Sequence, residues 1–247
     1  MSRITDRIKS VNAGGKKAII PYIPGGYPSE DRFWEIVKEL DEPDTGAIEV
    51  GIPFSDPVAD GPVVEAASLH CLKSGMTLAR ILDGAKKRKG AFGAPLVFMG
   101  YCNSFLRYGL ERFARDAGDA GVSGVIIPDL PLEETQEARE TLNAAGLDLI
   151  PLVGLNTPEE RLTQYAQVEQ GFVYFVSVLG TTGARETFPP ELRESLQRAR
   201  KHFSIPLALG FGLTTRSQID GFGGLVDAGV IGSALIRRID EGRDLRL

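Results

Sequence analysis

Short apolar segments rich in β-branched residues recur along the whole chain, and each is followed by a segment with helical periodicity. Most of these apolar segments are continuous rather than alternating, which is typical of parallel strands covered on both faces. The predicted strands are residues 17–23, 47–51, 95–101, 123–129, 148–154, 172–178, 206–212 and 224–232. The predicted helices are residues 29–40, 77–89, 109–121, 132–146, 157–167, 189–203 and 214–222, with a short eighth helix after the last strand.

Eight strand–helix units in 247 residues match the size of a TIM (β/α)8 barrel. The alternative is an open, doubly wound parallel sheet. That alternative is disfavoured because no glycine-rich G-x-G-x-x-G segment follows the first strand, and no residues remain for a second domain. We therefore predict an α/β fold in which residues 1–247 form a single TIM-barrel domain.

The composition narrows the functional classes. The net charge is about −5, which argues against a nucleic-acid-binding surface. No apolar run approaches the roughly 20 residues of a transmembrane helix, and the N-terminus lacks the apolar core of a signal peptide. The two cysteines and two histidines are scattered without metal-site spacing. We expect a cytoplasmic protein with no metal, no nucleic-acid partner and no membrane association.

A carboxylate interrupts the apolar second strand. Glu49 lies near the carboxyl end of that strand, where TIM barrels place their active sites. Its neighbours Ile48 and Val50 are suited to the side that faces the helices, so Glu49 should face the barrel mouth. Apolar walls would raise its pKa toward the range useful for proton transfer. The alternative is a structural carboxylate in a buried ion pair.

A second carboxylate, Asp60, follows in the loop "IPFSDPVADGP" after the same strand. This loop is longer than most strand–helix connections, and long loops are often functional. The alternative for Asp60 is a turn residue before Gly61, since Asp-Gly is a common turn pair. Asp56, in the same loop, is a weaker candidate.

Glycines gather at the carboxyl ends of the late strands, in the segments "TTGA" (181–184), "GFG" (210–212) and "GSAL" (232–235). TIM barrels often bind phosphate with the loops after the last two strands and a helix N-terminus. Glycine allows backbone N–H groups to approach the phosphate oxygens, and Ser233 offers a hydroxyl. Each glycine alone could equally be a turn residue, but together they predict a phosphate site.

These segments resemble the tryptophan synthase alpha chain family. The resemblance is carried by "IEVGIPFSDPVADG", "PYIPGGYPS", "MGYCNSFLRYGLERF", "GVIIPDLPLEE", "TTGAR", "GFG" and "GSA", in the family's order and over about residues 2 to 240. It implies a TIM barrel that cleaves indole-3-glycerol phosphate to indole and glyceraldehyde 3-phosphate, without a metal or cofactor of its own. It also implies a β subunit that carries pyridoxal phosphate, in an alpha2-beta2 heterotetramer.

The resemblance also implies residue roles. Glu49 and Asp60 match the catalytic acids, and Pro53 and Asp56 match positions that communicate with the β subunit. The residues that match the substrate and phosphate positions are Tyr22, Met99, Tyr101, Ile127, Tyr174, Thr182, Gly183, Phe211, Gly212, Gly232 and Ser233.

Two other functions are compatible with the same residues. One is a stand-alone indole-3-glycerol phosphate lyase that releases free indole. The other is a catalytically degenerate chain that only binds and activates a β subunit, although the presence of both Glu49 and Asp60 argues against it.

Overall fold

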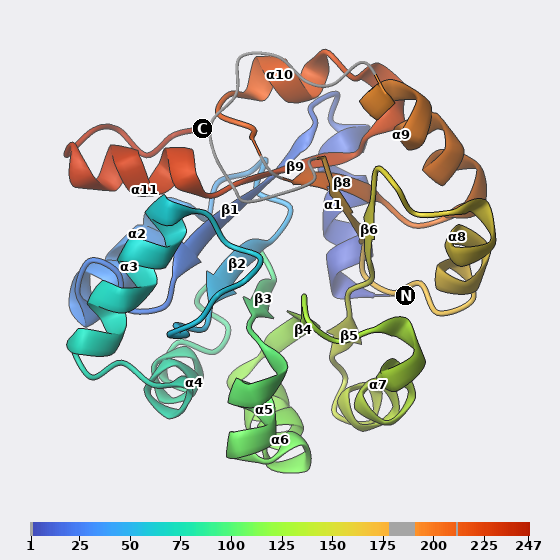
Figure 1. Ribbon diagram of the computed structural model, residues 1–247. Coiled ribbons are helices and arrows are strands. Elements are labelled where there is room, and N and C mark those ends of the chain that lie inside the picture. The colour runs from blue at the N-terminus through green and yellow to red at the C-terminus, as the bar shows by residue number, and fades with distance from the viewer. Residues whose placement is uncertain (1, 178–190, 211) are drawn as a thin grey trace.

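The computed structural model of the protein describes residues 2–177, 191–210 and 212–247. Within these residues, the strands form one parallel sheet that curls into a ring, and the helices surround it (Figure 1). The strand order is β5-β4-β3-β2-β1-β9-β8-β7-β6. The strands are β1 Ala18–Pro24, β2 Ile48–Gly51, β3 Leu96–Met99, β4 Val122–Ile126, β5 Asp148–Leu149, β6 Leu152–Gly154, β7 Val173–Val176, β8 Leu207–Gly210 and β9 Ala228–Ile231.

The ring closes through the segment predicted as the fifth strand, residues 148–154. Its first part, β5, pairs with β4, and its second part, β6, pairs with β7. Between them, the Ile150 N–H donates to the Val125 carbonyl (2.9 Å), and the Pro151 carbonyl accepts from the Tyr174 N–H (2.9 Å). The prediction of one continuous strand was wrong here, because Pro151 has no N–H to donate to the ladder. The predicted TIM barrel is confirmed.

The helices alternate with the strands, and several differ from the prediction. The described helices are α1 Arg3–Ala13, α2 Glu30–Glu39, α3 Pro62–Lys73, α4 Leu78–Lys87, α5 Cys102–Tyr108, α6 Leu110–Ala120, α7 Thr135–Ala144, α8 Glu159–Ala166, α9 Glu191–His202, α10 Arg216–Asp220 and α11 Ser233–Asp240, with short 3-10 turns at Leu132–Glu134 and Gly223–Leu225. Helices α1, α3 and α5 were not predicted. They lie before the first strand, after the loop that follows β2, and directly after β3.

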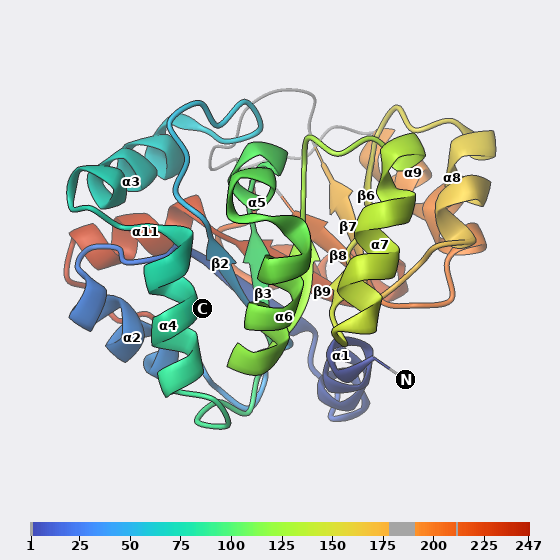
Figure 2. The same cartoon turned by 90° about the horizontal axis from the view of Figure 1, so that it is seen from below.

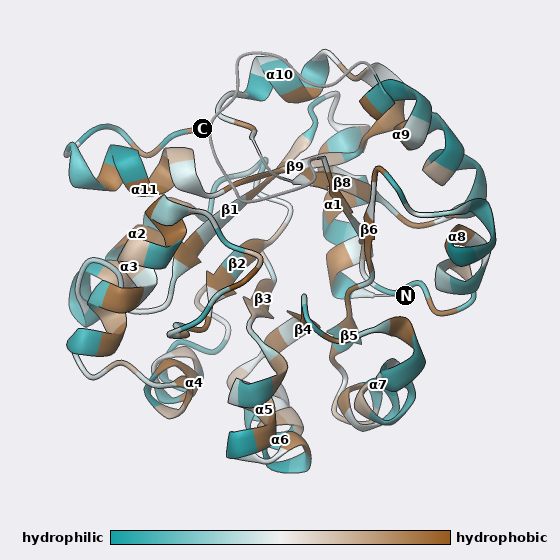
Figure 3. Ribbon diagram, viewed as in Figure 1, coloured by the Kyte–Doolittle hydropathy of each residue, from teal (hydrophilic) through white to brown (hydrophobic). Residues whose placement is uncertain are grey.

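Side-chain alternation divides the core into two layers. Ile48 and Val50 pack in the layer between strands and helices, whereas Tyr22 and Met99 lie in the barrel interior. Figure 3 shows apolar strands at the centre and polar outer faces on the helices. None of the helices in the described part of the chain is long and apolar enough to span a membrane.

Helix α1 closes the amino-terminal end of the barrel. Ser2 caps it by accepting hydrogen bonds from the backbone N–H groups of Ile4 and Thr5. Its buried side chains, Ile4, Ile8 and Val11, belong to the same apolar cluster as the barrel interior. Figure 2 shows α1 beneath the strands, at the end opposite the loop that joins β2 to α3. Access to the interior is therefore from the carboxyl-terminal mouth.

The α1 closure can be tested by truncating one of its side chains. Ile8 is fully buried, so Ile8→Ala should lower the free energy of unfolding by about 2–5 kcal/mol. The neighbouring Lys9 is exposed, and Lys9→Ala should change it by only about 0.5 kcal/mol. Urea denaturation of both variants makes the comparison. Similar losses would show that α1 does not contribute to the core.

Candidate active site

Glu49 occupies the position in β2 that faces the barrel interior. In the sheet it lies beside Tyr22 of β1 and Val97 of β3. Only 1% of Glu49 is exposed, and its side chain lines a cavity at the carboxyl-terminal mouth. Because Ile48 and Val50 pack against the helices, the predicted orientation of Glu49 is confirmed.

The surroundings of Glu49 favour its protonated form. Burial, and then the nearby charge of Asp60, raise the pKa of Glu49 to about 8. Its Oε2 atom has no hydrogen-bond partner among the described residues. Nor does any ion pair within that part of the chain include Glu49, so the alternative of a buried ion pair is not supported. A neutral carboxyl group at neutral pH is a proton donor.

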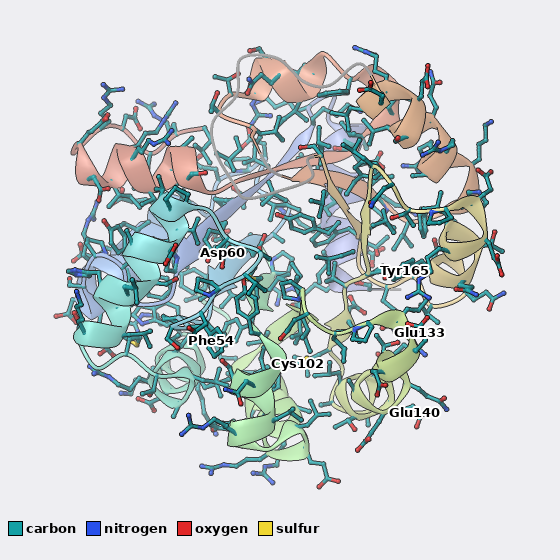
Figure 4. The ribbon with its side chains drawn as sticks, in the orientation of Figure 1. Phe54, Asp60, Cys102, Glu133, Glu140 and Tyr165 are labelled. Carbon is teal, nitrogen blue, oxygen red and sulfur yellow. The ribbon has the colours of Figure 1, made fainter. Side chains whose placement is uncertain are left out.

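Asp60 ends the loop after β2 and is held by Tyr101. The Tyr101 hydroxyl donates to Asp60 Oδ2 (3.1 Å) and accepts from the Ala59 N–H (3.0 Å). The Phe54 ring stacks on Tyr101 with centroids 5.1 Å apart. Burial raises the pKa of Asp60 to about 6, while the Tyr101 hydrogen bond lowers it and the charge of Glu65 raises it. Asp60 is therefore mostly ionised at neutral pH. Figure 4 shows it on the inner side of α3, toward the ring of strands.

The two acids line one cavity of about 370 Å³. The predicted site residues that line it are Tyr22, Glu49, Asp60, Met99, Tyr174, Gly212, Gly232 and Ser233. Tyr101 was expected in the indole pocket, but its role in the structure is to hold the loop through Asp60 and Ala59. Thr182, Gly183 and Phe211 lie outside the described residues.

Ile127 is placed elsewhere by the structure. It follows the end of β4 and packs in the layer between strands and helices, beside a separate cavity at α7. Its neighbour Ile126, the last residue of β4, lines the cavity that holds the two acids. Successive strand residues point to opposite faces, so a shift of one position moves a side chain out of the barrel.

The other end of the cavity is suited to an anion. Ser233 is the first residue of α11 and Gly232 is its cap, so backbone N–H groups of the helix start lie beside the cavity. Gly212 has a φ of +86°, a conformation that favours glycine over residues with side chains. No lysine or arginine is among the described residues that line the cavity. Among the described residues, the groups available to an anion here are backbone N–H groups, the helix dipole and the Ser233 hydroxyl.

Comparison with known proteins agrees with this geometry. A family model described as "Tryptophan synthase alpha chain" matches residues 8–246. The chain belongs to this family. It is 56% identical to the tryptophan synthase alpha chain of Solidesulfovibrio magneticus over 241 residues, covering 98% of this chain and 94% of the relative. It is 53% identical to that of Nitratidesulfovibrio vulgaris, covering 98% and 95%.

Solved structures show the same relationship. The Mycobacterium tuberculosis tryptophan synthase structure matches with a TM-score of 0.90 and 34% identity, covering 98% of this chain and 92% of that one. A tryptophan synthase complex from Pyrococcus furiosus matches with a TM-score of 0.83 and 33% identity, covering 92% and 91%. This chain therefore has the same fold as these solved tryptophan synthase structures.

The structure adds cavity residues that sequence reasoning missed. Asn156 follows β6 and lines the cavity, and its place at the carboxyl end of a strand could have identified it. Val64 also lines the cavity, but it lies on α3, a helix that was not predicted. Within the described ranges, no group of three metal-ligating side chains is close enough to hold a metal ion.

The two positions expected to communicate with a partner differ in exposure. Pro53 is buried at the start of the loop after β2, whereas Asp56 is exposed and accepts a hydrogen bond from Ser55 (2.5 Å). Two large apolar side chains are exposed: Val58 of the same loop (79%) and Leu106 of α5 (69%). Asp56 and Val58 are thus both exposed on the loop that ends in Asp60.

The buried carboxyl of Glu49 should make stability depend on pH. Its folded pKa of about 8 is above the ordinary value of 4.5, so its stabilising contribution is complete below about pH 4.5 and is lost as pH rises through 8. Glu49→Gln stays neutral throughout. We expect its free energy of unfolding to match the wild type near pH 4.5 and to exceed it by roughly 2–4 kcal/mol at pH 9.

Urea denaturation at the two pH values measures this difference. The matched control is Glu137→Gln, a substitution at an exposed position on α7 that should show no such growth with pH. A constant gap between Glu49→Gln and wild type at both pH values would contradict the assignment of Glu49 as a neutral buried acid.

Proposed function

We propose that this chain cleaves indole-3-glycerol phosphate to indole and glyceraldehyde 3-phosphate by a retro-aldol reaction, with no metal or cofactor of its own. The observation that carries the proposal is the pair of buried carboxyls in one cavity. Their pKa values lie on either side of neutrality, about 8 for Glu49 and about 6 for Asp60. One group is therefore ready to donate a proton while the other carries a negative charge.

Glu49 is assigned the proton transfers at carbon and oxygen. Direct cleavage at indole C3 would leave a poor carbanion, so C3 is protonated first, which makes the ring an electron acceptor. The Glu49 carboxyl supplies this proton. The resulting carboxylate then takes the proton of the side-chain hydroxyl as the carbon–carbon bond breaks. That oxygen becomes the aldehyde of glyceraldehyde 3-phosphate, and Glu49 is left protonated for the next cycle.

Asp60 is assigned the ring nitrogen. Protonation of C3 places positive charge on the ring N–H, and a nearby carboxylate stabilises that charge until the electrons of the broken carbon–carbon bond return to the ring and give neutral indole. Tyr101 supports this role because its hydrogen bonds to Asp60 and Ala59 hold the carboxylate at the cavity. The phosphate is assigned to Gly212, Gly232 and Ser233, at the start of α11.

A tryptophan synthase β subunit is the proposed partner, in an alpha2-beta2 heterotetramer, with pyridoxal phosphate on the β subunit. The loop after β2 supports this proposal, because it carries exposed Asp56 and Val58 in its middle and the buried Asp60 near its end. A β subunit that docks on the exposed side of this loop would hold Asp60 in place, because Asp56, Val58 and Asp60 belong to the same short loop. The segment "TTGARETFPP" (181–190) lies outside the described residues.

Indole release from indole-3-glycerol phosphate tests the proposed reaction. Glu49→Gln keeps the shape of the side chain but removes the acid, so turnover should fall by about 10³-fold while the fold is retained. For the wild type, kcat/KM should rise as Asp60 ionises near pH 6 and fall as Glu49 deprotonates near pH 8. Near-normal turnover of Glu49→Gln would exclude this mechanism. No indole release by the wild type, with or without a β subunit, would instead favour a chain that only activates its partner.

The partner proposal gives a separate prediction. A β subunit should raise the lyase rate at least about 10-fold, equivalent to about 1.4 kcal/mol of barrier. Asp56→Ala should lose most of this stimulation and keep the unaided rate, because Asp56 is exposed on the outer side of the loop. Asp31→Ala, at an exposed position on α2, is the control. Each variant is titrated with β subunit, and the rate of indole release is measured. Equal stimulation of the two variants would show that this loop does not couple partner binding to the lyase rate.

A further inference from the structure

Tyr22 presents a hydroxyl to the cavity that the proposed reaction has not yet used. The side chain is 6% exposed, lines the cavity and lies beside Glu49 in the β1–β2 register. Among the described residues, its hydroxyl makes no hydrogen bond, whereas Tyr101 makes two. A buried tyrosine hydroxyl usually has a partner. A tyrosine hydroxyl without a partner at a cavity wall indicates that a bound molecule supplies the hydrogen-bond partner.

Two glycines fix the place of the Tyr22 ring. A Cβ atom added at Gly51 would lie 2.3 Å from the Tyr22 hydroxyl oxygen, and one added at Gly232 would lie 3.1 Å from Tyr22 Cδ1. Gly232 has a φ of −113°, so the close approach of Tyr22, and not an unusual backbone conformation, favours glycine there. The ring therefore lies in a slot between the end of β2 and the start of α11.

The slot places the hydroxyl between the two chemical ends of the cavity. The backbone of Tyr22 lies beside Glu49 of β2. Its side chain extends toward the mouth, so that the hydroxyl reaches Gly51, two residues further along β2. The other edge of its ring touches Gly232, next to Ser233. Burial, followed by the charges of Asp60 and Glu49, raises the pKa of Tyr22 well above its ordinary value, so the hydroxyl remains a donor throughout the working pH range.

We propose that the Tyr22 hydroxyl binds the substrate oxygen that gives its proton to Glu49, and so selects for a hydroxyl on the carbon attached to indole C3. This inference rests on the proposed reaction. The substrate O–H proton passes to Glu49, the carbon–carbon bond breaks, and the oxygen becomes a carbonyl. Tyr22 keeps its own proton and donates a hydrogen bond to that oxygen throughout. A substrate analogue without chain hydroxyls leaves the Tyr22 donor unpaired.

Binding measurements separate this role from simple packing. In the Glu49→Gln background, where turnover should be about 10³-fold slower, calorimetry gives the Kd of two ligands with and without Tyr22→Phe. One ligand is indole-3-glycerol phosphate, and the other is the indole phosphate whose three-carbon chain has no hydroxyls. Tyr22→Phe should weaken the first about 10-fold, as expected for one hydrogen bond, and the second less than about twofold. With Glu49 intact, it should lower kcat/KM by at least about 10-fold.

The matched control is Tyr165→Phe. Tyr165 lies at α8, away from Asp60 and outside the cavity that holds the acids (Figure 4). This substitution also removes one phenol hydroxyl, but it should change neither Kd. Equal weakening of both ligands by Tyr22→Phe would assign Tyr22 to packing, and no weakening of either would exclude it from substrate binding. Both outcomes can be obtained while the wild type still releases indole, so they are distinct from a failure of the proposed reaction.

Discussion

The burial of the Glu49 carboxyl, which has no ion-pair partner in the part of the chain that the structure describes, is the constraint on which the rest of the site depends. A charged group there would lose its hydration with nothing to replace it, so the carboxyl keeps its proton near neutral pH. An arginine or lysine beside it would remove this property. The apolar barrel wall therefore contributes to the reaction by keeping Glu49 protonated. Burying this polar group also makes the barrel interior less stable.

The barrel interior must also leave room for a substrate. It does so because tyrosine rings pack against glycines of the neighbouring strands. Tyr22 extends over Gly51, and on the other side of the barrel the Tyr174 ring lies where a Cβ atom at Gly210 would be 2.3 Å away. The bulky rings thus lie against the wall, where side chains are missing, and the centre stays open. Helix α1 fills the opposite end of the barrel, so the open space is confined to the mouth.

The second acid depends on a neighbouring strand as well as on its own loop. Tyr101 follows β3, yet it contacts three residues of the loop after β2: Phe54, Ala59 and Asp60. A force applied to the outer side of the loop, where Asp56 is exposed, would therefore be transmitted to Asp60 through few contacts. This arrangement gives a physical basis for control of the site by a docked partner.

The sequence by itself determined the alternation of strands and helices, the number of units and the inward orientation of Glu49. These follow from local patterns, because strand residues alternate between two faces and Glu49 has apolar neighbours on both sides. Only the tertiary structure decided which strands pair with the two parts of the segment around Pro151, that Ile126 rather than Ile127 lines the cavity, and that Tyr101 holds Asp60. Each of these depends on contacts between segments far apart in the chain, which no local periodicity encodes.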